Sequence, residues 1–240
     1  RSNAPENMQT TALACLALWS QPPVLDAVEG RYRKYPPRDP KPAAKALSKV
    51  ADDLVGNASA KVLTVLARAI ERLKVTDLLP VVHAAYESDK ATPFLQAQLL
   101  GTMAELSDPD LGKYVEVALE SKDARLRTAA QKRAWAAGLS GIEIFAKALE
   151  SGSLQEKRSA LGNLAQSDDP QADALLAAQF AKLDPQLELD LLEVSSEAKG
   201  AKTIAKVKGT LEKALLKAGK IGIQSFSENN GFVTMVKAGS

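Results

Sequence analysis

Cysteine and histidine each occur once in the 240 residues, as Cys15 and His83. A single cysteine excludes an internal disulfide framework and every metal or haem motif that needs two cysteines. The sequence also contains no H-E-x-x-H, G-x-S-x-G, G-x-G-x-x-G, G-x-x-x-x-G-K-[ST] or EF-hand pattern. We therefore expect a non-catalytic chain with no cofactor and no bound metal, in which His83 is a packing residue of a helix.

Aromatic residues, charge of one sign and long apolar runs are also scarce. Aromatics make up 5% of the chain, whereas alanine and leucine dominate the 45% that is hydrophobic. This composition favours closely packed helices over a β-sandwich, which is rich in β-branched and aromatic residues. No apolar run approaches the ~20 residues of a membrane-spanning helix, so we expect no membrane insertion. The net charge of +2 provides no bulk attraction for nucleic acid.

What the chain does contain is an internal repeat. The pattern L-G-x-x-A-x-x-x-D-P occupies residues 100–109 and again residues 161–170, at a constant offset of 61 residues. A weaker copy lies halfway, at residues 133–140, so the repeating unit is a helical hairpin of roughly 30 residues. A single hairpin cannot bury its own apolar side, so the repeat predicts an all-α fold, an α-solenoid of HEAT/armadillo-like hairpins. The apolar anchors expected in successive hairpins are Ile70, Met103, Trp135 and Leu164.

Proline, glycine and aspartate divide the chain into elements. Asp-Pro pairs are typical of turns in which the aspartate caps the next helix and the proline takes its first position. A further helix is expected to begin at Thr76 or Asp77, with Pro80 in its first turn. The other expected helices span residues 6–19, 24–33, 43–55, 59–73, 93–106, 111–120, 123–137, 142–149, 154–165, 172–183, 187–197 and 202–218.

These elements give an expected organisation that begins in the middle of a longer protein. Two β-leaning runs around Asn229-Asn230-Gly231 predict a short β-hairpin at the C-terminal end, with a disordered end as the alternative. The expected segments are a cloning scar at 1–4, a first helical hairpin at 5–35, a proline-rich connector at 36–42, HEAT-like helical repeats at 43–220, and a tail or the start of a following domain at 221–240.

Two basic stretches leave a second function open. Residues 31–38 interleave cations with Tyr32 and Tyr35, and residues 199–220 carry seven lysines against one acid, Glu212. Such patterns can bind single-stranded nucleic acid, so a nucleic-acid-binding helical solenoid is the alternative function. Lysines at helical spacing are more often a solvated face. We therefore favour a protein, or neighbouring domains of the same chain, as the partner over nucleic acid.

Residues 19–39 also carry a family resemblance. The pattern W-x-x-P-P-x-x-D-x-V-x-G-x-x-R, followed by P-R-D, begins at Trp19 and ends at Asp39. It resembles the HEAT-repeat region of multidomain proteins of Planctomycetes and Verrucomicrobia, in which a sugar-dehydrogenase-like propeller often precedes the repeats and a c-type cytochrome domain often follows. The resemblance implies an exported bacterial parent protein, in the periplasm or otherwise outside the cytoplasm. Residues 233–237 lie near the family's haem motif but lack cysteine and histidine, so we expect no covalent haem here.

The same stretch supplies the candidate site. Its arginines and Asp39 are expected to tie the proline connector to the repeats through charge-assisted hydrogen bonds, and a binding epitope is the alternative role. The candidate residues are Trp19, Pro22, Pro23, Asp26, Gly30, Arg31, Arg33, Pro37, Arg38 and Asp39. The expected function is a non-catalytic helical-repeat scaffold that mediates protein–protein or interdomain contacts within a larger, redox-linked bacterial protein.

Overall fold

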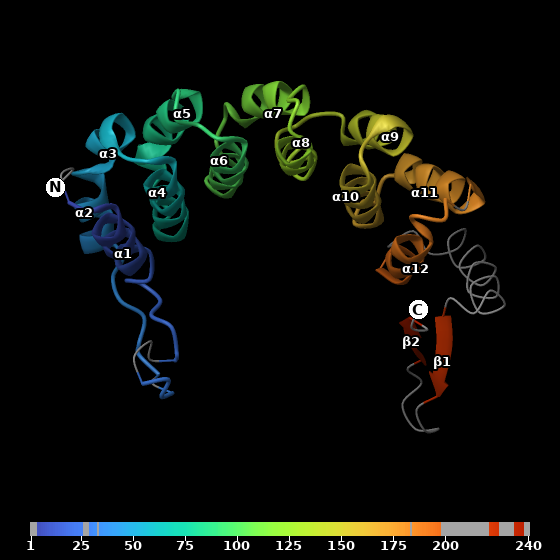
Figure 1. Cartoon of the computed structure of the whole chain (residues 1–240), viewed down its shortest axis with the longest axis horizontal. Helices are drawn as coiled ribbons and strands as arrows, with labels where there is room; N and C mark the ends of the chain where they lie inside the picture. The colour runs from blue at the N-terminus through green and yellow to red at the C-terminus, as the bar shows by residue number, and fades with distance from the viewer. Residues whose placement is uncertain are drawn as a thin grey trace. The chain divides into compact units, whose positions relative to one another are not determined.

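A computed structural model of the chain describes residues 4–25, 29–32, 34–182, 184–197, 221–225 and 233–237. The chain divides into two compact units, Arg1–Ser140 and Gly141–Ser240. Both units are built from α-helices, which confirms the all-α class, and two short strands lie near the C-terminal end (Figure 1). The expected helix at 202–218 and the turn at 229–231 lie outside the described residues.

The first unit is a two-layered array of helices. Helices α1, α4, α6 and α8 pack side by side in that order, and α3, α5 and α7 form the second layer over them (Figure 1). A short 3₁₀ helix, Thr76–Leu78, precedes α5. The helices are α1 (Glu6–Ala17), α2 (Lys41–Ser48), α3 (Ala51–Asn57), α4 (Ala60–Leu73), α5 (Leu79–Glu87), α6 (Pro93–Glu105), α7 (Leu111–Leu119) and α8 (Ala124–Gln131).

Leucine-rich faces of these helices form one continuous core. In α6, apolar side chains four residues apart, Leu95, Leu99 and Met103, share one face and are at most 1% exposed. The predicted anchors Ile70 and Met103 both belong to this core. Each fully buried leucine or methionine stabilises the fold by roughly 1.5–3 kcal/mol, and it can do so only because a neighbouring hairpin covers it.

The second unit has a core of its own and the same kind of turns. Helix α10 packs against α9, α11 and α12, and Phe145, Leu161 and Phe180 are at most 1% exposed in the centre. Ser153 and Glu156 form a capping box at the start of α10. The helices are α9 (Gly141–Ser151), α10 (Leu154–Ala165), α11 (Pro170–Lys182) and α12 (Glu188–Glu197).

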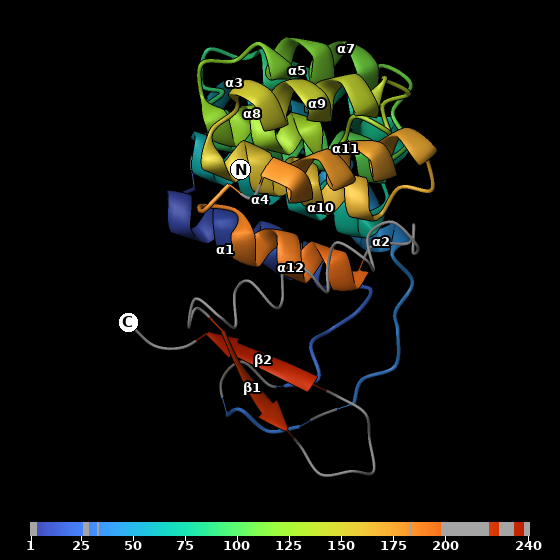
Figure 2. The same cartoon turned by 90° about the vertical axis from the view of Figure 1, so that its right-hand side faces the viewer.

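The two strands confirm the β-hairpin pairing expected near the C-terminal end. Strand β1 (Ile221–Ser225) pairs antiparallel with β2 (Val233–Lys237), with Ile221 opposite Lys237 and Ser225 opposite Val233 (Figure 2). The β-leaning runs on either side of the predicted turn therefore pair with each other.

All four Asp-Pro pairs form the same turn. In each, the aspartate Oδ1 accepts a hydrogen bond from the backbone N–H two residues later, which fixes the chain as it enters the next helix. The N···O distances are 3.0 Å for Asp39 and Lys41, 3.0 Å for Asp108 and Asp110, 2.8 Å for Asp169 and Gln171, and 3.0 Å for Asp184 and Gln186. The predicted capping role is confirmed for Asp169, which directly precedes α11, and is wrong for Asp39 and Asp108, because α2 and α7 begin later, with Pro40 and Asp110 at their N-caps and no side-chain cap.

Ser107, which precedes one of these turns, has φ +55, in the left-handed region that favours glycine. We expect Ser107→Gly to raise the free energy of unfolding by about 0.5–1 kcal/mol, because relief of strain outweighs the added freedom of the unfolded chain. Urea denaturation measures the change. Ser88→Gly is the matched control, since Ser88 ends α5 with φ −68 and gains nothing from glycine. If the Ser107 variant is no more stable than the Ser88 variant, the backbone at Ser107 is not strained.

Two predicted helices are wrong as drawn. The segment 24–33 has no helix in its described residues; Leu25 and Tyr32 instead form an isolated β-bridge, and Gly30 has φ +66. A short helix in water needs a packed face, and Leu25 is exposed with nothing to cover it. In the described residues of this segment, the second helix expected for the first hairpin is therefore absent. The predicted helix 43–55 is two helices, α2 and α3, because Val50 leaves the helical conformation at φ −121.

The anchor expected at Trp135 is also wrong. Helix α8 ends at Gln131, and turns follow where the helix was expected to continue to residue 137. Trp135 is 39% exposed, whereas Ala134 is fully buried at 0%. The halfway repeat thus places a small residue in the core one position earlier, and the large indole lies at the surface.

Candidate functional site

The α1–α2 loop, residues 18–40, contains the motif that the sequence singled out, and its two ends are joined. The Trp19 Nε1–H donates to the carbonyl oxygen of Asp39 at 3.0 Å, and the Arg38 N–H donates to the carbonyl oxygen of Ser20 at 3.0 Å. The Arg38 guanidinium carbon lies 5.2 Å from the centroid of the Trp19 ring, within cation–π distance. The loop is therefore closed at its base.

The rest of the predicted motif does not meet at this base. Arg31 Nε lies 3.4 Å from Glu29 Oε2, so Arg31 pairs with a carboxylate of its own loop. Gly30 supplies the left-handed residue of the bend next to it. Pro22, Pro23 and Pro37 lie in segments without regular secondary structure, and Asp26 and Arg33 lie outside the described residues.

Exposed apolar side chains gather on the α1–α2 loop, which extends away from the helical layers of the first unit (Figures 1 and 2). Among the large hydrophobic side chains exposed in the described part of the chain, half belong to this loop: Trp19 at 38%, Val24 at 49%, Leu25 at 58%, Tyr32 at 68% and Tyr35 at 41%. Aromatic residues and arginine are the types enriched at protein interfaces. The loop therefore has the composition of a docking surface.

An apolar groove lies at the start of the first unit, on α1, α2 and α3. It has a volume of about 280 Å³ and takes its lining mainly from α1 and the α2–α3 region. Met8 at its rim is 60% exposed. Its apolar lining includes Met8, Ala12, Leu16, Ala46, Val50 and Leu54.

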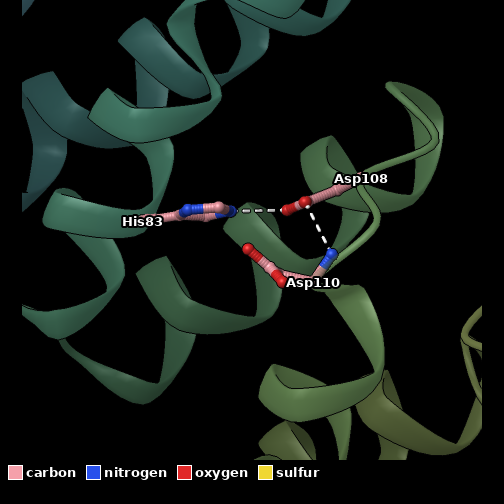
Figure 3. Close-up of side chains that lie close together, drawn as sticks. All are labelled: His83, Asp108 and Asp110. Atoms are coloured by element: carbon pink, nitrogen blue, oxygen red, sulfur yellow. Dashed lines mark hydrogen bonds and ion pairs between the residues drawn. The ribbon is translucent and has the colours of Figure 1, made fainter.

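A second cluster joins the lone histidine to an Asp-Pro turn in the first unit. His83 on α5 faces Asp108 and Asp110 in the α6–α7 turn, and both carboxylates point toward its ring (Figure 3). The His83 Nε2 lies 2.6 Å from Asp108 Oδ2, and Asp108 Oδ1 accepts the backbone N–H of Asp110 at 3.0 Å. The side chain of Asp108 is 1% exposed and that of His83 is 21% exposed. Asp110 is exposed at the surface.

A tyrosine pair closes one side of this cluster. The Tyr114 ring centroid lies 4.9 Å from that of His83 and 5.0 Å from that of Tyr86. The Tyr114 hydroxyl donates to Glu87 Oε1 at 2.8 Å. Burial, then the hydrogen bond to Glu87, and then the charges of Glu87, Asp108 and Asp110 raise the pKa of Tyr114 above its usual range. The surroundings of His83 are therefore rich in negative charge.

No family model, curated protein or solved structure matches this chain. Among the described residues, no helix combines the length and apolar character needed to cross a membrane. The assignment of a function therefore depends on the α1–α2 loop, the apolar groove and the His83 cluster.

Sequence analysis found the loop but missed the His83 cluster. His83 and Asp108 are 25 residues apart, and only the packing of α5 beside α6 and the turn that follows it brings them together. One signal was present in the sequence: Asp110 is the only acid found two positions after the aspartate of an Asp-Pro pair. The corresponding residues in the other three turns are Lys41, Gln171 and Gln186.

Proposed function

We propose that the chain is a stack of HEAT-like helical hairpins, an α-solenoid, that acts as a non-catalytic scaffold for contacts between proteins or domains. The 61-residue repeat, the shared Asp-Pro turns and the row of α1, α4, α6 and α8 support this proposal. Ion pairs also join neighbouring hairpins within each unit. Lys74 Nζ lies 3.0 Å from Glu105 Oε2, and Arg158 Nε lies 2.9 Å from Asp190 Oδ2.

The α1–α2 loop is the proposed docking surface, and its exposed apolar side chains carry the proposal. Leu25 and Tyr32 pair across the loop and remain more than half exposed. The closure of the loop by Trp19 and Arg38 restricts it before any partner arrives, which lowers the entropy lost on binding.

The charge of the loop indicates what kind of surface the partner presents. The loop contains four cations, all within residues 31–38, and three acids, Asp26, Glu29 and Asp39, so its net charge is +1. We propose a protein surface with apolar pockets for Leu25 and Tyr32 and an acidic rim, because complementary charge guides association. From the family resemblance, we also propose that this surface lies outside the cytoplasm, within a redox-linked parent protein.

Nucleic acid is the second candidate, and one observation favours it. Tyr32 and Tyr35 are exposed beside Arg31 and Lys34, and aromatic rings among cations can stack bases while the cations contact phosphates. The exposed aliphatic side chains Val24 and Leu25 have no use in such a contact. The protein partner is therefore the better supported of the two.

Affinity capture from the source cells with matched variants tests the docking surface. The loop variant carries Leu25→Ala and Tyr32→Ala; the control carries Phe94→Ala and Val117→Ala, two side chains on α6 and α7 that are each 63% exposed. We expect a protein captured by the wild type and the control to fall at least tenfold with the loop variant. Thermal unfolding followed by circular dichroism should give the same midpoint for all three proteins.

The outcomes of this experiment separate the two candidates. A capture profile that is the same for the loop variant and the control would contradict the docking role of the loop. A parallel titration with a fluorescent single-stranded DNA at low salt tests the alternative, since electrostatic binding is strongest there. If the wild type binds this DNA and the loop variant does not, nucleic acid becomes the better supported partner.

A further inference from the structure

We infer that His83, Asp108 and Asp110 bind one divalent transition-metal ion. One nitrogen and two carboxylate oxygens, one from each residue, all lie within 4.8 Å of one another. Zn²⁺ binds imidazole nitrogen at about 2.0–2.1 Å and carboxylate oxygen at about 2.0–2.2 Å. Donor atoms around a tetrahedral ion lie about 3.3 Å apart, so binding moves His83 Nε2 and Asp108 Oδ2 apart from their 2.6 Å contact and turns the exposed Asp110 side chain toward them. The proposal replaces the sequence-based expectation that His83 has a packing role only.

The Asp108 carboxylate is held in the orientation that a ligand needs. Its Oδ1 accepts the Asp110 N–H at 3.0 Å, and its Oδ2 is aimed at His83 Nε2, 2.6 Å away (Figure 3). A hydrogen bond to the atom of a ligand that does not bind the metal orients that ligand and raises the affinity of the site. Asp110 is exposed, so an ion can reach the site from solvent, while the other carboxylate is buried.

Comparison with the other Asp-Pro turns shows that turn formation does not require these ligands. The same backbone hydrogen bond forms at Asp39, Asp169 and Asp184, where the residue two positions later is lysine or glutamine. No histidine hydrogen bond accompanies those three turns in the described part of the chain. His83 and Asp110 are thus additions at one turn of four, and their donor atoms lie within 4.8 Å of each other.

The local charge also favours a cation. Asp108, Asp110 and Glu87 surround the edge formed by His83 and Tyr114. Lys113 Nζ lies over the Tyr114 ring, 5.2 Å from its centroid. In the described ranges, neither lysine nor arginine forms an ion pair with Asp108 or Asp110. Carboxylates without a positive partner attract a divalent ion.

The ligand set indicates the kind of ion. Imidazole with two carboxylates suits Zn²⁺ and the neighbouring divalent ions of the first transition row, and three protein ligands leave a position for water. Binding exchanges the hydrogen bond between His83 and Asp108 for two bonds to the ion, so the imidazole must be neutral and its Nε2 lone pair must face the ion.

Zn²⁺ titration against a chromophoric chelator tests the inference, in a Cys15→Ser background because the free thiol is an independent zinc ligand. We expect one equivalent of Zn²⁺ per chain, with at least tenfold weaker binding in both Asp110→Asn and His83→Gln. Asp169→Asn changes a turn that has no histidine and should leave the affinity unchanged. Asp110 is exposed, so its variant should unfold at the same temperature as the parent protein without metal.

Two results would overturn the site. The first is no binding of Zn²⁺, Co²⁺ or Mn²⁺ at micromolar concentrations by the full chain. The second is zinc binding that Asp110→Asn and His83→Gln leave unchanged, which would place the ion elsewhere. Co²⁺ supplies an independent readout, since its visible absorption should change intensity when one oxygen ligand is lost in the Asp110 variant.

Discussion

Replacement of Leu100 by aspartate will unfold the first unit. Leu100 is 0% exposed on α6 and belongs to the core that joins all the hairpins of that unit. Truncation of a buried leucine to alanine already costs about 2–5 kcal/mol, and aspartate adds the cost of a carboxylate buried among apolar side chains. The sum approaches the total stability of a typical domain, about 5–15 kcal/mol. Circular dichroism should show loss of helix, and hydrogen exchange should show lost protection of α4 to α8 together.

Val117→Asp on α7 is the control, because Val117 is 63% exposed and its replacement buries no charge. Its midpoint of thermal unfolding should stay near that of the wild type. Leu161→Asp applies the same test to the second unit, where Leu161 is 0% exposed at the equivalent position of the repeat. A Leu100→Asp chain that melts like the wild type, or that loses protection in α6 alone, would contradict a core shared between stacked hairpins.

The helical hairpins were predictable because several independent signals coincide in them. Thr92 caps α6 and accepts the N–H of Leu95 at 3.2 Å, as its place before Pro93 predicts. The L-G-x-x-A-x-x-x-D-P repeats place Leu100 and Leu161 at equivalent, fully buried positions. Local propensity, apolar spacing and turn chemistry point to the same structure there, and such agreement makes a sequence easy to interpret.

The errors occur where only one signal was available. Residues 24–33 have helical spacing of apolar side chains, but Leu25 is exposed and no neighbouring helix covers it. Packing therefore does not stabilise a helix in this segment. Trp135 lies at the expected repeat distance, yet the core at that level takes Ala134. Spacing alone cannot show how much room two approaching helices leave, and that room decides between a methyl group and an indole.

The two candidate sites differ in how far sequence can reveal them. The contact of Trp19 with Asp39 and Arg38 lies within one loop, so a local pattern could indicate it. The contact of His83 with Asp108 depends on how α5 packs beside the following turn. No rule of composition or spacing gives that distance of 2.6 Å, because the separation of the two side chains in space is fixed only when the helices pack.

The Asp108→Ala variant will lose about 3 kcal/mol of unfolding free energy without any metal. The substitution removes the turn bond to the Asp110 N–H, worth about 1 kcal/mol, and the bond to His83, worth about 1.5–3 kcal/mol for a charged partner. The carboxylate is almost fully buried, so solvent cannot replace these bonds in full. Urea denaturation measures the change.

Asp169→Ala is the matched comparison, because Asp169 makes the same turn bond at 2.8 Å, is exposed and has no histidine partner. It should cost only about 1 kcal/mol, the value of a cap. A double-mutant cycle of His83→Ala and Asp108→Ala isolates their contact, and the coupling free energy should be about 1.5–3 kcal/mol. Coupling near zero would mean that the two residues act independently and that the turn alone stabilises the fold. A coupling of the expected size would show that the histidine joins one hairpin to the next, which is the contact that a bound ion would replace.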